Sequence, residues 1–291
     1  MVVTNNNELL VLGGHSLNQK GPNDKAKICL IYKDNEWRHH SMFNLKRAYS
    51  CAITMPDGIY VFGGTLFDTP SSHYSCELLP NNQSQWNVID ASFPRFGMMM
   101  AHCVAISSSK ILFTGGVRPV SKRLTTFDIM NKTWKNEGKL IHERWGHASF
   151  QFNGKVIITG GKNDTDVLRS TEVLTLKSMK LKEGGRLNEP RWGHGMGIID
   201  VKGIQKLVVF GGSPEKSPFL LSDDADEIQL TSIEAWNDVE ECWVTTDLHL
   251  PDGLSHFAFC SKTDFNKYRK SEKKGSALAK LNKFLRPKFI K

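Results

Sequence analysis

Short runs of apolar residues, each ended by two glycines, recur along the chain. Each run is too short for a helix and too uniformly apolar for a strand with one face in water. The pattern therefore predicts five buried strands, and the glycines supply backbone freedom where each strand ends. With their glycines, the runs cover residues 9–14, 59–64, 111–116, 156–161 and 207–212.

The spacing of these glycine doublets is nearly constant. Their second glycines stand at positions 14, 64, 116, 161 and 212, so the steps between them are 50, 52, 45 and 51 residues. Such a period is typical of repeat architectures, in which each repeat is one supersecondary unit. A sixth doublet, Gly184-Gly185, follows a charged segment and is not counted with the others.

The remainder of each period is repeated as well. Asp57-Gly58 and Asn153-Gly154 lie between apolar runs, and these dipeptides indicate tight β-hairpins. A tryptophan, which we expect in the core, follows four doublets at positions 37, 86, 134 and 243, and Met179 takes this place in the fourth repeat. A basic residue opens a strand ahead of four doublets, as Arg47, Arg95, Arg144 and Arg191.

This order of strand, turn, strand with Gly-Gly, strand and tryptophan resembles the kelch repeat over roughly residues 1–260. The resemblance implies an all-β fold, a β-propeller in which each repeat is a four-stranded antiparallel blade around a central channel. We therefore expect a propeller at residues 1–261 and a separate basic tail at residues 262–291. The sequence departs from the family pattern at Met179 and ahead of residues 254–256, where no arginine is found.

The two ends of the repeat array carry a prediction about ring closure. Residue 1 begins just ahead of a Gly-Gly strand, whereas residues 255–260 look like an innermost strand with no doublet after it. We expect the first blade to lack its innermost strand and the C-terminal strand to pair there, closing a ring of five blades. Closure removes open sheet edges. The alternative is a fragment that has lost blades from its N-terminal side.

Composition favours an intracellular protein. No stretch of eighteen apolar residues occurs, and residues 1–8 are unlike a signal peptide, so we expect neither a transmembrane segment nor export. The six cysteines are scattered over different repeats without a Cys-x-x-Cys motif, which is typical of reduced thiols in a core. We expect a monomer in the cytoplasm or nucleus.

The positive charge is concentrated at the C-terminus. Residues 262–291 contain eleven Lys and Arg against Asp264 and Glu272, a net charge of +9, while the whole chain carries +8. The propeller is therefore nearly neutral, and contact with RNA or an anionic surface is a hypothesis about the tail alone. A solvated tail, disordered or with a short amphipathic helix, is the alternative.

No motif for catalysis is present. The glycine doublets end strands and do not lead into a phosphate-binding helix, and the ten histidines lack metal-ligand spacing. No nucleophile motif frames the serines. We therefore expect a protein that is not an enzyme, with no cofactor and no metal.

Loops that enter the innermost strands of a propeller surround the mouth of its channel, so residues near each repeated arginine should converge. An aromatic and arginine-rich rim has the composition of an interaction hot spot, and guanidinium groups there could pair with partner carboxylates. The candidate partner-binding residues are Arg47, Tyr49, Arg95, Phe96, Arg144, Trp145, His147, Arg191, Trp192 and His194. The alternative is structural: the arginines brace neighbouring blades, the tryptophans wedge between them and the histidines are satisfied inside.

The long insertions at residues 15–27 and 213–227 break the repeat and are further candidates. We predict a non-catalytic scaffold that binds another protein through the channel-mouth loops. One alternative comes from the Arg-Trp-Gly-His segments, which look like those of the kelch domain in the tRNA wybutosine-synthesising methyltransferase; the chain would then be an accessory domain. Another is substrate recognition for a ubiquitin ligase, for which kelch propellers are often used.

Overall fold

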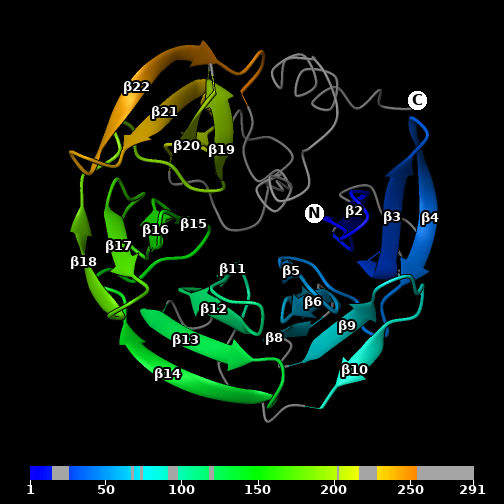
Figure 1. Cartoon of the computed structure of the whole chain (residues 1–291). Helices are drawn as coiled ribbons and strands as arrows, with labels where there is room; N and C mark the ends of the chain where they lie inside the picture. The colour runs from blue at the N-terminus through cyan, green and yellow to red at the C-terminus, as the bar shows by residue number, and fades with distance from the viewer. Residues whose placement is uncertain are drawn as a thin grey trace.

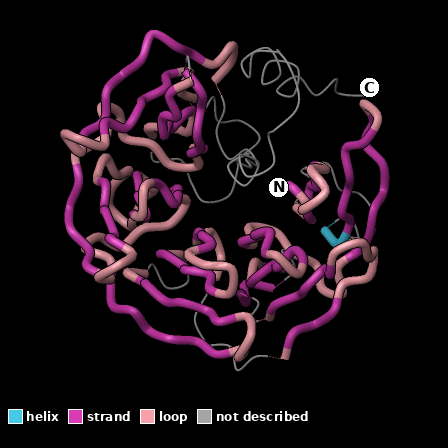
Figure 2. The backbone as a smooth tube through the Cα atoms, in the orientation of Figure 1, coloured by secondary structure: helices cyan, strands magenta, loops and turns pink. Residues whose placement is uncertain are grey.

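The strands of the chain form five four-stranded antiparallel sheets, arranged as the blades of a β-propeller (Figure 1). The computed structural model describes residues 1–14, 26–66, 69–72, 75–90, 98–117, 121–201, 203–215 and 228–253. The backbone in these ranges is strand, loop and turn, with one short helical turn at residues 26 and 27 (Figure 2). The predicted all-β propeller with five blades is confirmed.

Each blade takes its strands from one period of the repeat. The first blade contains β1 (Val2–Val3), β2 (Leu9–Leu12), β3 (Ile28–Lys33) and β4 (Glu36–Met42). The second contains β5 (Cys51–Met55), β6 (Gly58–Phe62), β9 (Cys76–Pro80) and β10 (Asn87–Ile89), beside the small hairpin of β7 (Thr65–Leu66) and β8 (Thr69–Ser72). The third contains β11 (His102–Ala105), β12 (Lys110–Thr114), β13 (Arg123–Asp128) and β14 (Thr133–Lys139). The fourth contains β15 (Ala148–Phe152), β16 (Lys155–Thr159), β17 (Thr171–Thr175) and β18 (Lys180–Gly184), and the fifth β19 (Gly195–Val201), β20 (Ile204–Phe210), β21 (Ser232–Asn237) and β22 (Cys242–His249).

The apolar runs of the sequence are the second strands of the blades. In β12, Ile111, Leu112 and Phe113 are completely buried, because the strand pairs with β11 on one side and β13 on the other and both of its faces pack against neighbouring blades. The outermost strands are polar and largely exposed, as in β14 and β18. The second strand is thus uniformly apolar because it lies inside the blade, with both faces covered.

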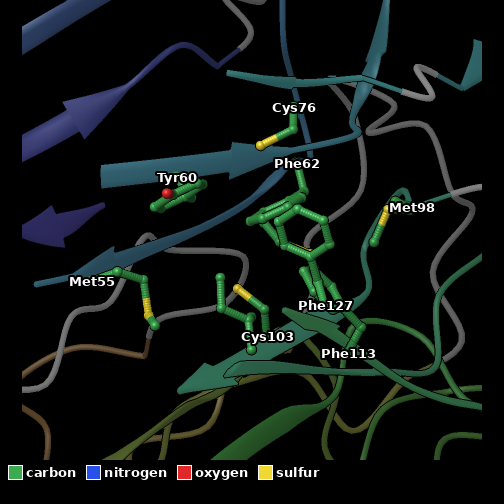
Figure 3. Packing of buried hydrophobic residues seen from close by; sticks show 10 residues of the cluster. Met55, Tyr60, Phe62, Cys76, Met98, Cys103, Phe113 and Phe127 are labelled. Carbon is green, nitrogen blue, oxygen red and sulfur yellow. The ribbon is translucent and has the colours of Figure 1, made fainter. Parts of the chain in front are cut away.

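The cores lie between blades. Phe62 of the second blade contacts Phe113 and Phe127 of the third edge to face, with ring centroids 4.7 and 5.6 Å apart (Figure 3). The strands nearest the channel pack in chain order, β1 against β5, β5 against β11, β11 against β15 and β15 against β19. The first and fifth blades stand at the two ends of this series (Figure 1).

Two expectations about the ends and the tryptophans need correction. The first blade does not lack its innermost strand, since β1 pairs with β2 through Val2–Leu10 and Val3–Leu9. The strand that we predicted at residues 255–260 and the tail at residues 262–291 lie outside the described residues. Trp37 was predicted to be a core residue but is 45% exposed on β4, unlike the buried Trp86 and Trp243.

Candidate functional site

The repeated arginine lies directly ahead of the first strand of a blade, and its side chain is completely buried. Arg144 donates from Nη1 to the carbonyl oxygen of Gly160, the first glycine of the doublet in its own blade, over 2.7 Å. Its own carbonyl oxygen accepts from the amide of Gly116 in the preceding blade, over 2.9 Å. One residue thus joins two blades. Arg47 makes the corresponding bonds to Gly63 in its own blade and Gly14 in the preceding one, and Arg191 makes them to Gly211 and Gly161.

Each of these arginines pairs with a buried glutamate on the third strand of its blade. Arg144 Nη2 lies 2.7 Å from Glu172 Oε1, and neither side chain is exposed to solvent. Burial lowers the pKa of Arg144, and the charge of Glu172 opposes this effect. The corresponding pairs are Arg47–Glu77 at 3.0 Å and Arg191–Glu234 at 2.7 Å.

The same glutamates also hold the loop that precedes each arginine. Glu172 accepts hydrogen bonds from the amides of Ile141 and His142, at 2.8 and 3.0 Å. Glu77 binds the amides of Asn44 and Leu45 in the same way, and Glu234 those of Asn188 and Glu189. We call this unit of arginine, glutamate and loop amides the latch. These glutamates were not predicted from the sequence, although a Ser-x-Glu sequence at residues 75–77, 170–172 and 232–234 marks all three.

The third blade departs from this arrangement. Its strand β13 carries Arg123 and Thr125 at the positions that hold serine and glutamate in the latches. The correspondence follows from a backbone bond: the amide of Gly115 donates to the carbonyl oxygen of Arg123, as the amide of Gly160 does to that of Ser170. Burial lowers the pKa of Arg123 to about 10. Arg95 and Phe96, which we predicted for this blade's site, lie outside the described residues.

The two predicted tryptophans pack against each other between the fourth and fifth blades. The rings of Trp145 and Trp192 are buried and meet edge to face at 5.3 Å. The ammonium of Lys162 lies 3.5 Å from the ring centroid of Trp192 and 4.4 Å from that of Trp145. This cation between two aromatic rings was not predicted, and it occupies the space that a partner's cation would need.

The predicted histidines are buried and bonded to threonines of the preceding blade. Nε2 of His147 lies 2.8 Å from Oγ1 of Thr114, and Nε2 of His194 lies 2.9 Å from Oγ1 of Thr159. Burial is the main cause that lowers the pKa of both imidazoles well below the usual value, so both rings are neutral near pH 7.

A line of backbone hydrogen bonds runs around the channel mouth from blade to blade. Met100 N donates to Tyr49 O, Gly146 N to Met100 O and Gly193 N to Gly146 O, at 3.0, 3.1 and 2.8 Å. All four residues have positive φ, between 52° and 62°. Tyr49 is half-buried, and burial raises its pKa.

The structure describes eight of the ten predicted residues, and seven of these eight are buried. The Nη atoms of Arg47, Arg144 and Arg191 donate to acceptors within the chain, and the aromatic rings and imidazoles fill the joints between blades. Exposed residues occur in the loops that the latches hold, among them Leu45 and, at the end of β4, Met42, with exposed fractions of 38% and 46%. We call the loops 42–46, 141–143 and 188–190 the latched loops.

Metal-ligand groups and membrane-spanning helices were looked for in the ranges that the structure describes. Among those residues no group of three or more His, Cys, Asp or Glu side chains could hold a metal ion. Within the same ranges, no helix is long and apolar enough to cross a membrane.

Comparison with known proteins agrees with the architecture. The human and mouse proteins named Kelch-like protein 15 are each 23% identical to this chain over 253 aligned residues, which cover 76% of the chain. The repeat is of the kelch type. Alpha-scruin of Limulus polyphemus is 28% identical over 144 residues, or 46% of the chain and 15% of that protein. The chain spans about 40% of the length of the human Kelch-like protein. No protein-family model matches the chain.

Proposed function

We propose that this kelch-type propeller is a protein-interaction module that binds a partner protein through the latched loops, without catalysis and without a cofactor. The kelch-like relatives and the fold support an interaction domain. The observation that carries the choice of face is that buried carboxylates fix the backbone of three loops whose outer side chains are exposed. Binding to a preorganised surface loses less conformational entropy than binding to flexible loops.

The composition of the latched loops supports a partner contact of mixed character. Met42 and Leu45 present apolar surface, while His142 and Glu189 add polar side chains. The arginines contribute by holding these loops in place rather than by touching the partner. In this proposal the chain acts as a monomer inside the cell.

The test uses the full chain as bait, with substitutions at exposed positions only. We expect Leu45→Asp to abolish capture of the main partner, and Met42→Asp to lower it at least tenfold, since each places a charge in an apolar contact. Val239→Asp is the matched control, because Val239 is 93% exposed on the turn between β21 and β22, at the opposite face. Quantitative mass spectrometry of captured proteins measures the effect. Loss of the partner with Val239→Asp, but not with Leu45→Asp, would show that the opposite face binds.

A further inference from the structure

Neighbouring first strands contact each other through one defined pair of positions near the channel. Between the third and fourth blades the pair is His102 of β11 and Ser149 of β15, whose Nδ1 and Oγ atoms are 2.8 Å apart. These positions can be counted from Met99 and Trp145, which form corresponding β-bridges in their blades. His102 follows Met99 by three residues, and Ser149 follows Trp145 by four.

The same count places two cysteines face to face between the second and third blades. Ala48 forms the corresponding bridge in the second blade. Cys51 follows Ala48 by three residues, and Cys103 follows Met99 by four. The positions that bring histidine and serine together between the third and fourth blades therefore bring two thiols together between the second and third blades.

Direct contacts agree with this placement. The thiol of Cys51 donates to the carbonyl oxygen of Ala101, the residue just ahead of β11, over 3.0 Å. The thiol of Cys103 donates to the carbonyl oxygen of Ala52 on β5 over 3.7 Å. Both cysteines belong to the buried cluster of Figure 3, in which Cys103 is labelled. Each sulfur thus reaches across to the strand that carries the other.

A small cavity gives access to this pair. Its volume is about 150 Å³, and Ser50, Cys51, His102 and Cys103 are among the residues that line it. Cys51 and Cys103 are 5% and 9% exposed. A cavity of this size admits water-sized molecules and excludes proteins and large thiols.

We propose that Cys51 and Cys103 form a dithiol site that closes to a disulfide between the second and third blades when hydrogen peroxide enters the cavity. One thiolate attacks a peroxide oxygen, the O–O bond breaks, and a sulfenic acid and one water form once the leaving oxygen has taken a proton. The second thiol attacks the sulfenic sulfur, the S–O bond breaks and a second water leaves. The two thiols supply the two electrons that reduce the peroxide.

The environment makes this step slow and its product durable. The neighbouring Cys51 thiol and burial raise the pKa of Cys103 well above its usual value, so little thiolate exists at neutral pH. The disulfide would connect the innermost strands β5 and β11 and restrict the separation of two blades. Because the cavity excludes large thiols, reduction should require a small reductant.

The experiment treats the full chain with hydrogen peroxide, blocks remaining thiols with iodoacetamide and analyses a non-reducing digest by mass spectrometry. We expect a cross-linked peptide containing Cys51 and Cys103, lighter by two hydrogens than the sum of its parts, which dithiothreitol separates. The melting temperature should rise by several degrees, since the link constrains the unfolded chain, and should return after reduction.

Three variants make the result specific. Cys51→Ser and Cys103→Ser should abolish the cross-link and the rise in melting temperature, and Cys242→Ser, at a half-buried thiol on β22, should retain both. The digest of the unsubstituted protein stands even if a variant fails to fold. Oxidation of Cys51 or Cys103 to sulfinic acid without a link, or full alkylation of both after treatment, would overturn the proposal.

Discussion

At the scale of single residues, a buried ion pair between arginine and glutamate recurs in three blades. A fully buried arginine and glutamate gain most from each other when their remaining donors and acceptors are also bonded. Here the partners are a glycine carbonyl, a serine and two loop amides, although Nε of Arg144 and of Arg191 is left without a hydrogen bond. Removing one member leaves the other as an unpaired buried charge. The third blade, with Thr125 in place of the glutamate, shows that this propeller does not need a latch in every blade.

Glu172→Gln tests the latch of the fourth blade. Glutamine retains most of the shape of glutamate but leaves Arg144 without a carboxylate, so we expect the free energy of unfolding to fall by about 3–5 kcal/mol. Urea denaturation of the full chain measures it. The control is Glu36→Gln in the exposed pair Arg38–Glu36, where the change should stay below about 1 kcal/mol. Similar small losses in both variants would contradict a latch that stabilises the blade.

At the scale of strands and turns, the glycine doublets are where one blade approaches the next. Gly160 has φ +57°, and a Cβ there would meet the carbonyl oxygen of Arg191 and lie 2.8 Å from Cε1 of His194. The residue is therefore constrained both by its backbone conformation and by a neighbouring blade. Gly154, in the turn between β15 and β16, has φ +73° but open space around it.

This contrast predicts different costs for the same substitution. Gly154→Ala should cost about 1–2 kcal/mol, because a positive φ is unfavourable for an L-residue. Gly160→Ala should cost at least about 2 kcal/mol more, since the joint between the fourth and fifth blades must open to admit the methyl group. Thermal and urea unfolding of both variants measure the difference. Equal costs would mean that backbone conformation alone explains the doublet.

Sequence patterns predicted these elements well where burial is uniform. The second strands could be recognised because both of their faces are covered, which leaves at least three consecutive apolar residues in each. The innermost strand of the first blade was missed because β1 has only two residues, too few for a periodic signal. Glu77, Glu172 and Glu234 were missed because an acidic residue in a strand looks solvent-exposed until its arginine partner is seen. Trp37 kept the repeat spacing but lies on an outer strand at the surface.

At the scale of the whole molecule, residues of successive blades form a continuous inner layer around the channel. The backbone hydrogen bonds from Tyr49 to Gly193 cross three joints between blades. Below them, His102, His147 and His194 come from three successive blades, and the rings of His102 and His147 lie 6.2 Å apart. Burial lowers the pKa of His147 most, and the charges of His102 and His194 lower it further.

Acid should therefore lower the stability of the propeller through the buried histidines of this inner layer. Burial lowers the pKa of His102 to about 4, whereas an unfolded histidine has a pKa of about 6.5. Between these values the unfolded chain binds more protons than the folded one, so stability is complete above about pH 6.5 and declines as the pH falls. At pH 5 the contribution of His102 is a loss of at most about 2 kcal/mol, since each pKa unit corresponds to about 1.4 kcal/mol.

His102→Gln should flatten the fall in urea midpoint between pH 7.5 and pH 5, while His249→Gln, at an exposed position on β22, should leave its slope unchanged. An equally steep decline in the His102 variant would place the acid sensitivity outside the channel layer.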